Sequence, residues 1–264
     1  MRRLELQEIH DHPKFPNFLR DLVTDALQSL WNFGNSYEPI LARLLQSMKY
    51  AGTREVLDLC SGGGGPWPRL ARELDLQQQD SQILVRLTDK YPNQGAFEQA
   101  RATTQMLQYE PTPIDATRIP ADLRGFRTIF SSFHHFGPDR AREVLEDAVR
   151  CRRGFGTFEV ARRSPKTMLT ICLLPAISWL LAPSIRPFRW SRLFWTYVIP
   201  VVPFVLFYDG MVSCLRAYSR QELEELVEPL AKVYEWHMGE ERRGFLPVTY
   251  LLGYPVREKP DFAD

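Results

Sequence analysis

The order of hydrophobic and polar positions divides the chain into a helical beginning and a longer region of alternating strands and helices. Over residues 18–30 and 37–48, apolar side chains recur at the spacing of amphipathic helices. Beyond residue 50, short apolar runs alternate with helical stretches, and the predicted strands are residues 55–59, 83–88, 106–109, 128–131 and 156–160. The third strand is expected to continue toward residues 114–116. This alternation predicts a doubly wound α/β sheet, with helices on both faces.

The last part of the chain completes the predicted sheet. Ser219 and Glu222 have the spacing of a capping box that opens a helix. Strand-like segments follow near residues 232–238 and 247–252, which makes seven strands. We therefore expect an N-terminal helical cap (1–50) and a Rossmann-like domain (51–264), interrupted after the fifth strand by an apolar helical insertion (165–215).

The charge and the cysteine spacing limit which partners we expect the protein to bind. The formal net charge is +1 over 264 residues, so no global field attracts a nucleic acid backbone. The four cysteines are not spaced as a zinc site, which indicates reduced thiols in a cytoplasmic protein. We expect neither a metal nor a nucleic acid partner.

A glycine loop and two acidic residues follow successive predicted strands. Residues 62–65 are four glycines, which let a ligand approach the backbone closely. Asp89 ends the second strand, where its carboxylate can accept hydrogen bonds from both hydroxyl groups of a ribose. Asp115 follows the third strand and could accept a hydrogen bond from an adenine amino group. The carboxyl ends of parallel strands meet at one edge of a sheet, so the three features together predict a nucleoside site there.

These motifs resemble those of the class I S-adenosylmethionine-dependent methyltransferases, over roughly residues 50–160. The match covers Val56-Leu57-Asp58-Leu59-Cys60-Ser61-Gly62-Gly63-Gly64, then Asp89, the Asp115-Ala116 pair and the segment 130–136. The resemblance implies S-adenosylmethionine as cofactor and an antiparallel last strand, for which residues 247–252 are the candidate. The cofactor-binding residues that it implies are Asp58, Cys60, Ser61, Gly62, Gly63, Gly64, Asp89, Lys90, Asp115, Ala116 and Ser131.

A nicotinamide-dependent oxidoreductase is the nearest alternative enzyme. Its G-x-G-x-x-G fingerprint opens a helix directly, but here Pro66 follows the glycines and Trp67 occupies the third glycine position. A cofactor-binding scaffold without activity is the alternative from another class of function.

Two adjacent histidines are the candidates for catalysis. Methyl transfer requires mainly proximity and orientation, and a general base only where the acceptor must lose a proton. His134 and His135 lie beyond the fourth strand, near the expected methyl group, although such histidines often only anchor the next helix. The N-terminal segment offers rival polar candidates and two aromatic residues that could line the site: His10, Asp11, His12, Phe15 and Phe18.

The insertion is unusually apolar. Residues 167–185 and 193–208 carry no charge, and three arginines lie between them. A spanning hairpin would carry these arginines across the membrane, which is unfavourable. A membrane-surface patch and a buried cap or dimer interface through residues 167–208 remain as alternatives. Both alternatives favour a small hydrophobic acceptor such as a lipid, quinone, isoprenoid or polyketide. We expect a cytoplasmic enzyme, with peripheral membrane contact under the first alternative.

Overall fold

A computed structural model describes residues 2–76, 83–186, 188–243 and 247–256. Its centre is a seven-stranded sheet in the order β3-β2-β1-β4-β5-β7-β6. The first five strands run parallel, and β7 is antiparallel to both of its neighbours. The strands are β1 (Glu55–Leu59), β2 (Leu84–Leu87), β3 (Leu107–Tyr109), β4 (Phe126–Phe130), β5 (Phe155–Glu159), β6 (Tyr234–Arg242) and β7 (Pro247–Pro255). The predicted Rossmann-like sheet and its antiparallel last strand are confirmed.

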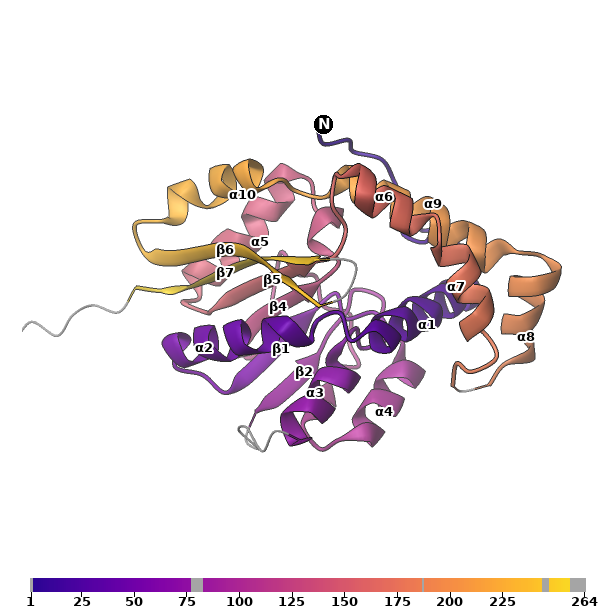
Figure 1. Cartoon of the computed structure of the whole chain (residues 1–264). Coiled ribbons are helices and arrows are strands. Elements are labelled where there is room, and N and C mark those ends of the chain that lie inside the picture. Colours follow the sequence, from indigo (N-terminus) through magenta and orange to yellow (C-terminus); the bar gives the residue numbers. More distant parts are fainter. Residues whose placement is uncertain (1, 77–82, 187, 244–246, 257–264) are drawn as a thin grey trace, which may run out of the picture.

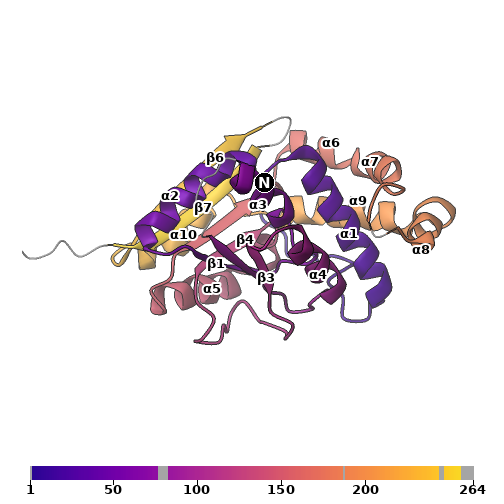
Figure 2. The same ribbon diagram turned by 90° about the horizontal axis from the view of Figure 1, so that it is seen from below.

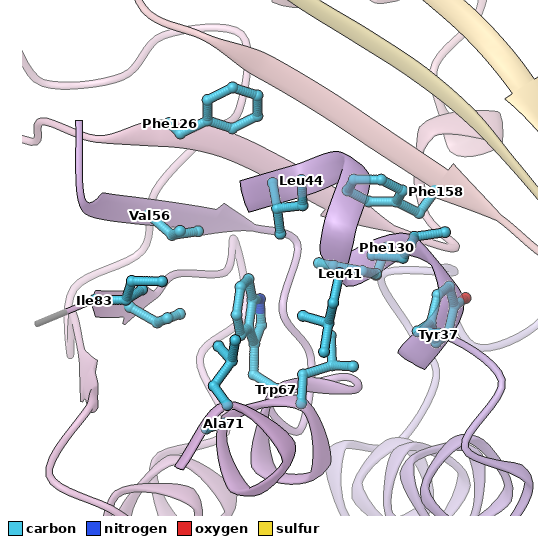
Figure 3. Packing of buried hydrophobic residues seen from close by; sticks show 14 of the residues in the cluster. Tyr37, Leu41, Leu44, Val56, Trp67, Ala71, Ile83, Phe126, Phe130 and Phe158 are labelled. Atoms are coloured by element: carbon cyan, nitrogen blue, oxygen red, sulfur yellow. The ribbon is translucent and has the colours of Figure 1, made fainter. Parts of the chain in front are cut away.

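Helices cover both faces of this sheet because successive side chains of a strand point to opposite sides. Val56 of β1 packs under the helices of one face, and Leu57 packs under those of the other. Trp67 is buried at the centre of the first face (Figure 3). The first face carries α2 (Leu41–Ala51), α3 (Trp67–Leu76) and α4 (Gln94–Thr103), and the second carries α5 (Pro138–Arg150) and α10 (Arg220–Val227).

Two details of local structure concern the predicted helix at residue 219 and the predicted third strand. The Ser219–Glu222 capping box is formed at the start of α10, as predicted. The expected continuation of the third strand to residues 114–116 is wrong, because β3 ends at Tyr109. Pro111 and Pro113 follow it, and proline cannot donate to a strand ladder.

A separate helical layer lies at the carboxyl edge of the parallel strands (Figures 1 and 2). Leu22 and Val23 of the first helix pack against Val205 and Leu206 of the insertion, in a core distinct from the two that flank the sheet. Residues 1–50 are thus divided between this layer and the sheet, on which α2 packs. The layer consists of α1 (Asn17–Gly34), α6 (Pro165–Ile171), α7 (Leu174–Leu181), α8 (Trp190–Leu193), the π-helical turn η3 (Phe194–Val198) and α9 (Val201–Arg216).

The helices of the insertion are short. Within the described residues, no single helix has both the length and the hydropathy to cross a bilayer. Residues 190–198 and α9 meet the criteria only when taken together, and they are bent by 71° at the break between them.

Candidate cofactor and acceptor site

A cavity of about 470 Å³ lies between the carboxyl ends of the parallel strands and the helical layer. Its floor is formed by the loops that follow the five parallel strands β1 to β5, and its roof by α1, α6, α7 and α9. This volume is within the range of about 300–1,000 Å³ that is usual for small-molecule sites. All the predicted cofactor-binding residues except Gly64, and both predicted histidines, line this one cavity. A Cβ atom at Gly64 would instead face Ala100 and Leu87.

The glycine loop has a backbone that side chains would disfavour. Gly62, Gly64 and Gly65 have φ values of 53°, 99° and 53°. A Cβ atom added at Gly63 would lie 3.2 Å from both Gln28 Oε1 and Thr24 Cγ2 of α1. The loop therefore requires glycine for its own turn, and α1 packs directly over it.

Two strand ends beside the loop also adopt left-handed backbone conformations. Cys60 after β1 has φ 56° and Ser131 after β4 has φ 46°, and such conformations cluster at functional sites. Tyr37 and Ser131 share a hydrogen bond of 2.5 Å between their hydroxyl groups. Burial raises the pKa of the Cys60 thiol, so this cysteine stays protonated and is a poor nucleophile.

Asp58 stabilises the loop from beneath. Its carboxylate accepts hydrogen bonds of 2.6 Å from the hydroxyl groups of Ser61 and Thr128. Burial nevertheless raises the pKa of Asp58 to about 7. Asp58 and Ser61 therefore stabilise the conformation of the loop. Both residues also border the cavity.

Asp89 connects the second strand to the glycine loop. Its carboxylate accepts the N–H groups of Gly62 and Tyr91, each at 2.7 Å. Burial raises the pKa of Asp89, and these two backbone hydrogen bonds oppose the rise. Two backbone donors leave lone pairs of this carboxylate for a ligand hydroxyl group.

The predicted adenine side of the site is also assembled. Ile114 donates its N–H to the carbonyl of Asp89 at 2.9 Å, and Ala116 is buried against the cavity. Lys90 lies 3.0 Å from Asp115. Burial acts to raise the pKa of Asp115, but hydrogen bonds from Thr117 and Lys90 outweigh it and lower the pKa. Asp115 is therefore ionised and engaged by its neighbours.

The two predicted histidines lie in the 3-10 turn η2 (Phe133–His135), where each is oriented by a carboxylate. His134 Nδ1 lies 2.7 Å from Glu159, at the end of β5, and His135 Nδ1 lies 2.6 Å from Asp11. The opposite Nε2 atoms face Glu8, at 3.4 Å from His134 and 3.6 Å from His135.

The charges of this cluster shift the pKa values of its members. Burial acts to lower the pKa of His134, but Glu159 and Glu8 raise it to about 10. Burial likewise opposes ionisation of Glu8, but the three neighbouring imidazoles hold its pKa well below the ordinary value. His10 binds Asp209 of α9 at 2.7 Å, and its pKa is raised to about 9 against the effect of burial.

The N-terminal candidates have different locations. His10 and Asp11 border the cavity, whereas His12 does not. The expectation that Phe15 and Phe18 line the site is wrong. Phe15 packs in the core between α1 and the insertion, and Phe18 is exposed beside Trp195 because α1 turns this side of the helix outward.

Three site residues were missed by sequence reasoning: Glu8, Glu159 and Asp209. Glu159 could have been found, because it ends β5 and so lies at the same edge of the sheet as Asp89. Glu8 and Asp209 give no sequence signal. They come from the N-terminal segment and the insertion, which meet only in the folded chain.

Comparisons with known proteins bear on the fold. No family model and no curated protein matches the chain. Among solved structures, human N-acetylserotonin methyltransferase in complex with S-adenosylmethionine is 13% identical, with a TM-score of 0.49, over 89% of this chain and 56% of its own. The methyltransferase domain of bacterial Hen1 is 10% identical, with a TM-score of 0.49, over 83% of this chain and 97% of its own. A protein from Rhodobacter sphaeroides described as a Zn-dependent alcohol dehydrogenase is 13% identical, with a TM-score of 0.47, over 89% of this chain and 98% of its own.

These likenesses are distant, and this chain spans only about half the length of two of the matched structures, 56% of N-acetylserotonin methyltransferase and 55% of PigF. The fold is defined by the sheet itself. Its order, with β7 inserted antiparallel between β5 and β6, is that of the Rossmann-like class I methyltransferase fold.

Proposed function

We propose that the protein is an S-adenosylmethionine-dependent methyltransferase that acts on a small hydrophobic acceptor. One observation carries the proposal: the glycine loop, Asp89 and the Asp115-Ala116 pair follow successive strands and border one cavity. This is the order in which the motifs of class I methyltransferases would contact the methionine, ribose and adenine parts of the cofactor. The strained turns at Cys60 and Ser131 lie at the same edge.

The residues of the chain would bind and orient the cofactor, which supplies an electrophilic methyl group when bound. Asp89 is positioned by two backbone donors and would accept ribose hydroxyls. Gly62–Gly64 would allow close approach of the methionine part, while Ile114 and Ala116 would flank the adenine. His134 and His135 border the same cavity and would lie beside the acceptor.

The roof of the cavity supports a hydrophobic acceptor. Ile171, Leu174 and Leu206 of the insertion line it, together with Val23 and Leu27 of α1. Apolar walls with a few polar groups are usual where an apolar ligand must be oriented. The roof would also exclude water from the transferring methyl group.

We further propose that the outer face of the insertion contacts a membrane surface, from which an apolar acceptor would enter. Trp190 is 78% exposed and Leu180 is 80% exposed. Arg186 and Arg189 lie in the same segment, and arginine together with tryptophan favours the headgroup region. Further exposed apolar residues of the insertion include Leu169, Leu173, Trp179, Phe194, Tyr197, Val198 and Phe204.

Calorimetry would test the cofactor. We expect S-adenosylhomocysteine to bind and NADH not to bind, and Asp89→Ala to weaken the former at least tenfold. Asp122→Ala, which removes an exposed carboxylate outside the cavity, is the matched control. Binding of NADH in place of S-adenosylhomocysteine would support the oxidoreductase alternative.

Transfer of a labelled methyl group into cell lipid extracts would test activity. We expect labelled product with the wild-type chain. Binding of S-adenosylhomocysteine without turnover on any extract would indicate a scaffold rather than an enzyme.

Sedimentation with anionic liposomes would test the membrane contact. We expect the wild type to co-sediment, and Leu180→Ser with Trp190→Ser to reduce binding severalfold. Leu76→Ser is the control, because Leu76 is 78% exposed on α3, outside the insertion. A dimer that ignores liposomes would instead identify this face as an interface between two copies.

A further inference from the structure

The wall of the cavity contains a group of three side chains with the composition of a transition-metal site. One ligand atom each from Glu8, His134 and His135 lies within 4.8 Å of the others. A tetrahedral metal with bonds of about 2.0–2.1 Å places its ligand atoms roughly 3.3–3.4 Å apart. The distances from Glu8 oxygens to the two Nε2 atoms are 3.4 and 3.6 Å, close to this spacing.

Each histidine of this group is anchored through its other nitrogen. Glu159 holds His134 Nδ1 at 2.7 Å, and Asp11 holds His135 Nδ1 at 2.6 Å. Both Nε2 atoms are thereby directed toward Glu8. Metal-binding histidines almost always have such a carboxylate or carbonyl partner, which fixes the ring and increases its basicity as a ligand.

One contact of the group is an ion pair that lacks hydrogen-bond geometry. Within the described part of the chain, His134 Nε2 is buried and makes no hydrogen bond, although Glu8 lies 3.4 Å away. Buried polar atoms are nearly always paired, so an unpaired imidazole nitrogen that faces a carboxylate requires an explanation. A divalent cation between the two groups would replace the Nε2 proton of His134 and bind both side chains, while Glu8 keeps the hydrogen bond of 2.9 Å that it accepts from Ser213.

We propose that Glu8, His134 and His135 bind one divalent first-row transition metal. Two imidazoles and one carboxylate form a donor set that suits Zn²⁺, Fe²⁺, Co²⁺ or Mn²⁺ better than Mg²⁺ or Ca²⁺. All three side chains border the cavity. A coordination position left open by three protein ligands would face this cavity and would be available to an acceptor oxygen. This last role rests on the proposed methyl transfer, whereas metal binding does not.

A second group, Glu8, His10 and Asp209, shares the same glutamate but fits less well. Its His10 atom would be Nδ1, which already bonds Asp209 at 2.7 Å. Asp209 also accepts the backbone N–H groups of Ile9 and His10, so it secures the N-terminal segment to α9. This second group therefore serves to position Glu8.

Metal binding to the full chain is the primary test. After removal of metals with a chelator, we expect Zn²⁺ or Co²⁺ alone to bind at one ion per chain by calorimetry and elemental analysis. Co²⁺ should give visible d–d absorption, and either metal should raise the Tm. Failure of the wild-type chain to bind any of these ions at millimolar concentration would overturn the proposal.

Variants identify the ligands. Glu8→Gln and His135→Gln should abolish the Co²⁺ absorption, and Glu159→Gln should weaken binding about 10–100-fold, as for other residues that orient a ligand. His237→Gln is the control, because His237 lies on β6 outside the cavity. Loss of binding in His237→Gln, or unchanged binding in both ligand variants, would contradict the assignment. Metal binding by the wild-type chain tests the proposal by itself, so the test stands even if a variant unfolds.

Binding of S-adenosylhomocysteine to the same preparations separates this inference from the proposed function. A wild-type chain that binds the nucleoside but no metal would refute only the metal site. A chain that binds metal but no nucleoside would refute the methyltransferase and leave the metal site standing.

Discussion

Arg192 donates a hydrogen bond of 2.7 Å to Asp25, and this buried ion pair joins the insertion to α1. Both side chains are nearly inaccessible to solvent. Arg192 also donates to the carbonyl of Ile185 at 3.0 Å, within the insertion. The pair therefore fixes the helical layer that roofs the cavity.

Removing one member of this pair should destabilise the chain strongly. We expect Arg192→Ala to lower the free energy of unfolding by about 3–5 kcal/mol, because Asp25 would remain buried without its guanidinium partner. Urea unfolding followed by circular dichroism measures the effect. Arg220→Ala, which removes an exposed arginine that pairs with Glu224 on α10, should cost less than about 1 kcal/mol. Equal losses in the two variants would contradict the role of the buried pair.

The glycine loop should tolerate alanine poorly at Gly64. Its φ of 99° is unfavourable for an L-residue, and a new Cβ would meet Ala100 and Leu87 at 3.4–3.5 Å. We expect Gly64→Ala to cost about 1–2 kcal/mol of stability and to weaken S-adenosylhomocysteine binding. Gly95→Ala in α4 has room for its Cβ and should be neutral or stabilising by up to about 1 kcal/mol. Thermal unfolding and calorimetry compare the two, and equal behaviour would argue against strain in the loop.

The hydroxyl group of Tyr37 should matter although its ring stays buried. Tyr37→Phe removes the hydrogen bond to Ser131 and keeps the packing against Phe130 and Trp31. We expect a loss of about 1 kcal/mol in stability, since a single neutral hydrogen bond is removed. Tyr50→Phe is the control at a partly exposed tyrosine. A loss of stability in Tyr50→Phe as large as that in Tyr37→Phe would contradict a specific role for the Tyr37 hydroxyl group.

The buried carboxyl of Asp58 should make stability depend on pH. Its pKa is raised from 3.8 to about 7 by burial, so between these values the folded chain binds a proton that the unfolded chain has released. Its contribution is therefore fully present below pH 3.8 and is lost as the pH rises through 7. We expect wild-type stability relative to Asp58→Asn to fall by roughly 2–4 kcal/mol between about pH 4 and about pH 8.

Urea unfolding at several pH values checks this dependence. Asp122→Asn should keep the wild-type slope, because its carboxyl is exposed. An Asp58→Asn variant whose pH profile parallels that of the wild type would show that Asp58 titrates normally.

The sequence by itself determined the sheet and the part of the site that would bind the cofactor. Apolar runs and turn residues are local signals, so β1 and the sites of the glycine loop, Asp89 and Asp115 could be predicted. Their assembly at one edge follows from parallel connectivity alone. The extent of β3 was misjudged, because the pattern gave apolar residues more weight than the prolines that interrupt the ladder.

Only the tertiary structure decided how the histidines, their carboxylate partners and the helical layer are arranged around the cavity. Nothing in the sequence shows that Glu8 approaches His134, that Asp209 approaches His10, or that Arg192 approaches Asp25. Each of these contacts joins segments more than a hundred residues apart. The apolar insertion was recognised from composition, but only its packing against α1 showed which face lines the cavity and which is exposed. A local pattern specifies which residues a chain can bury. The partners against which they are buried depend on how distant segments meet.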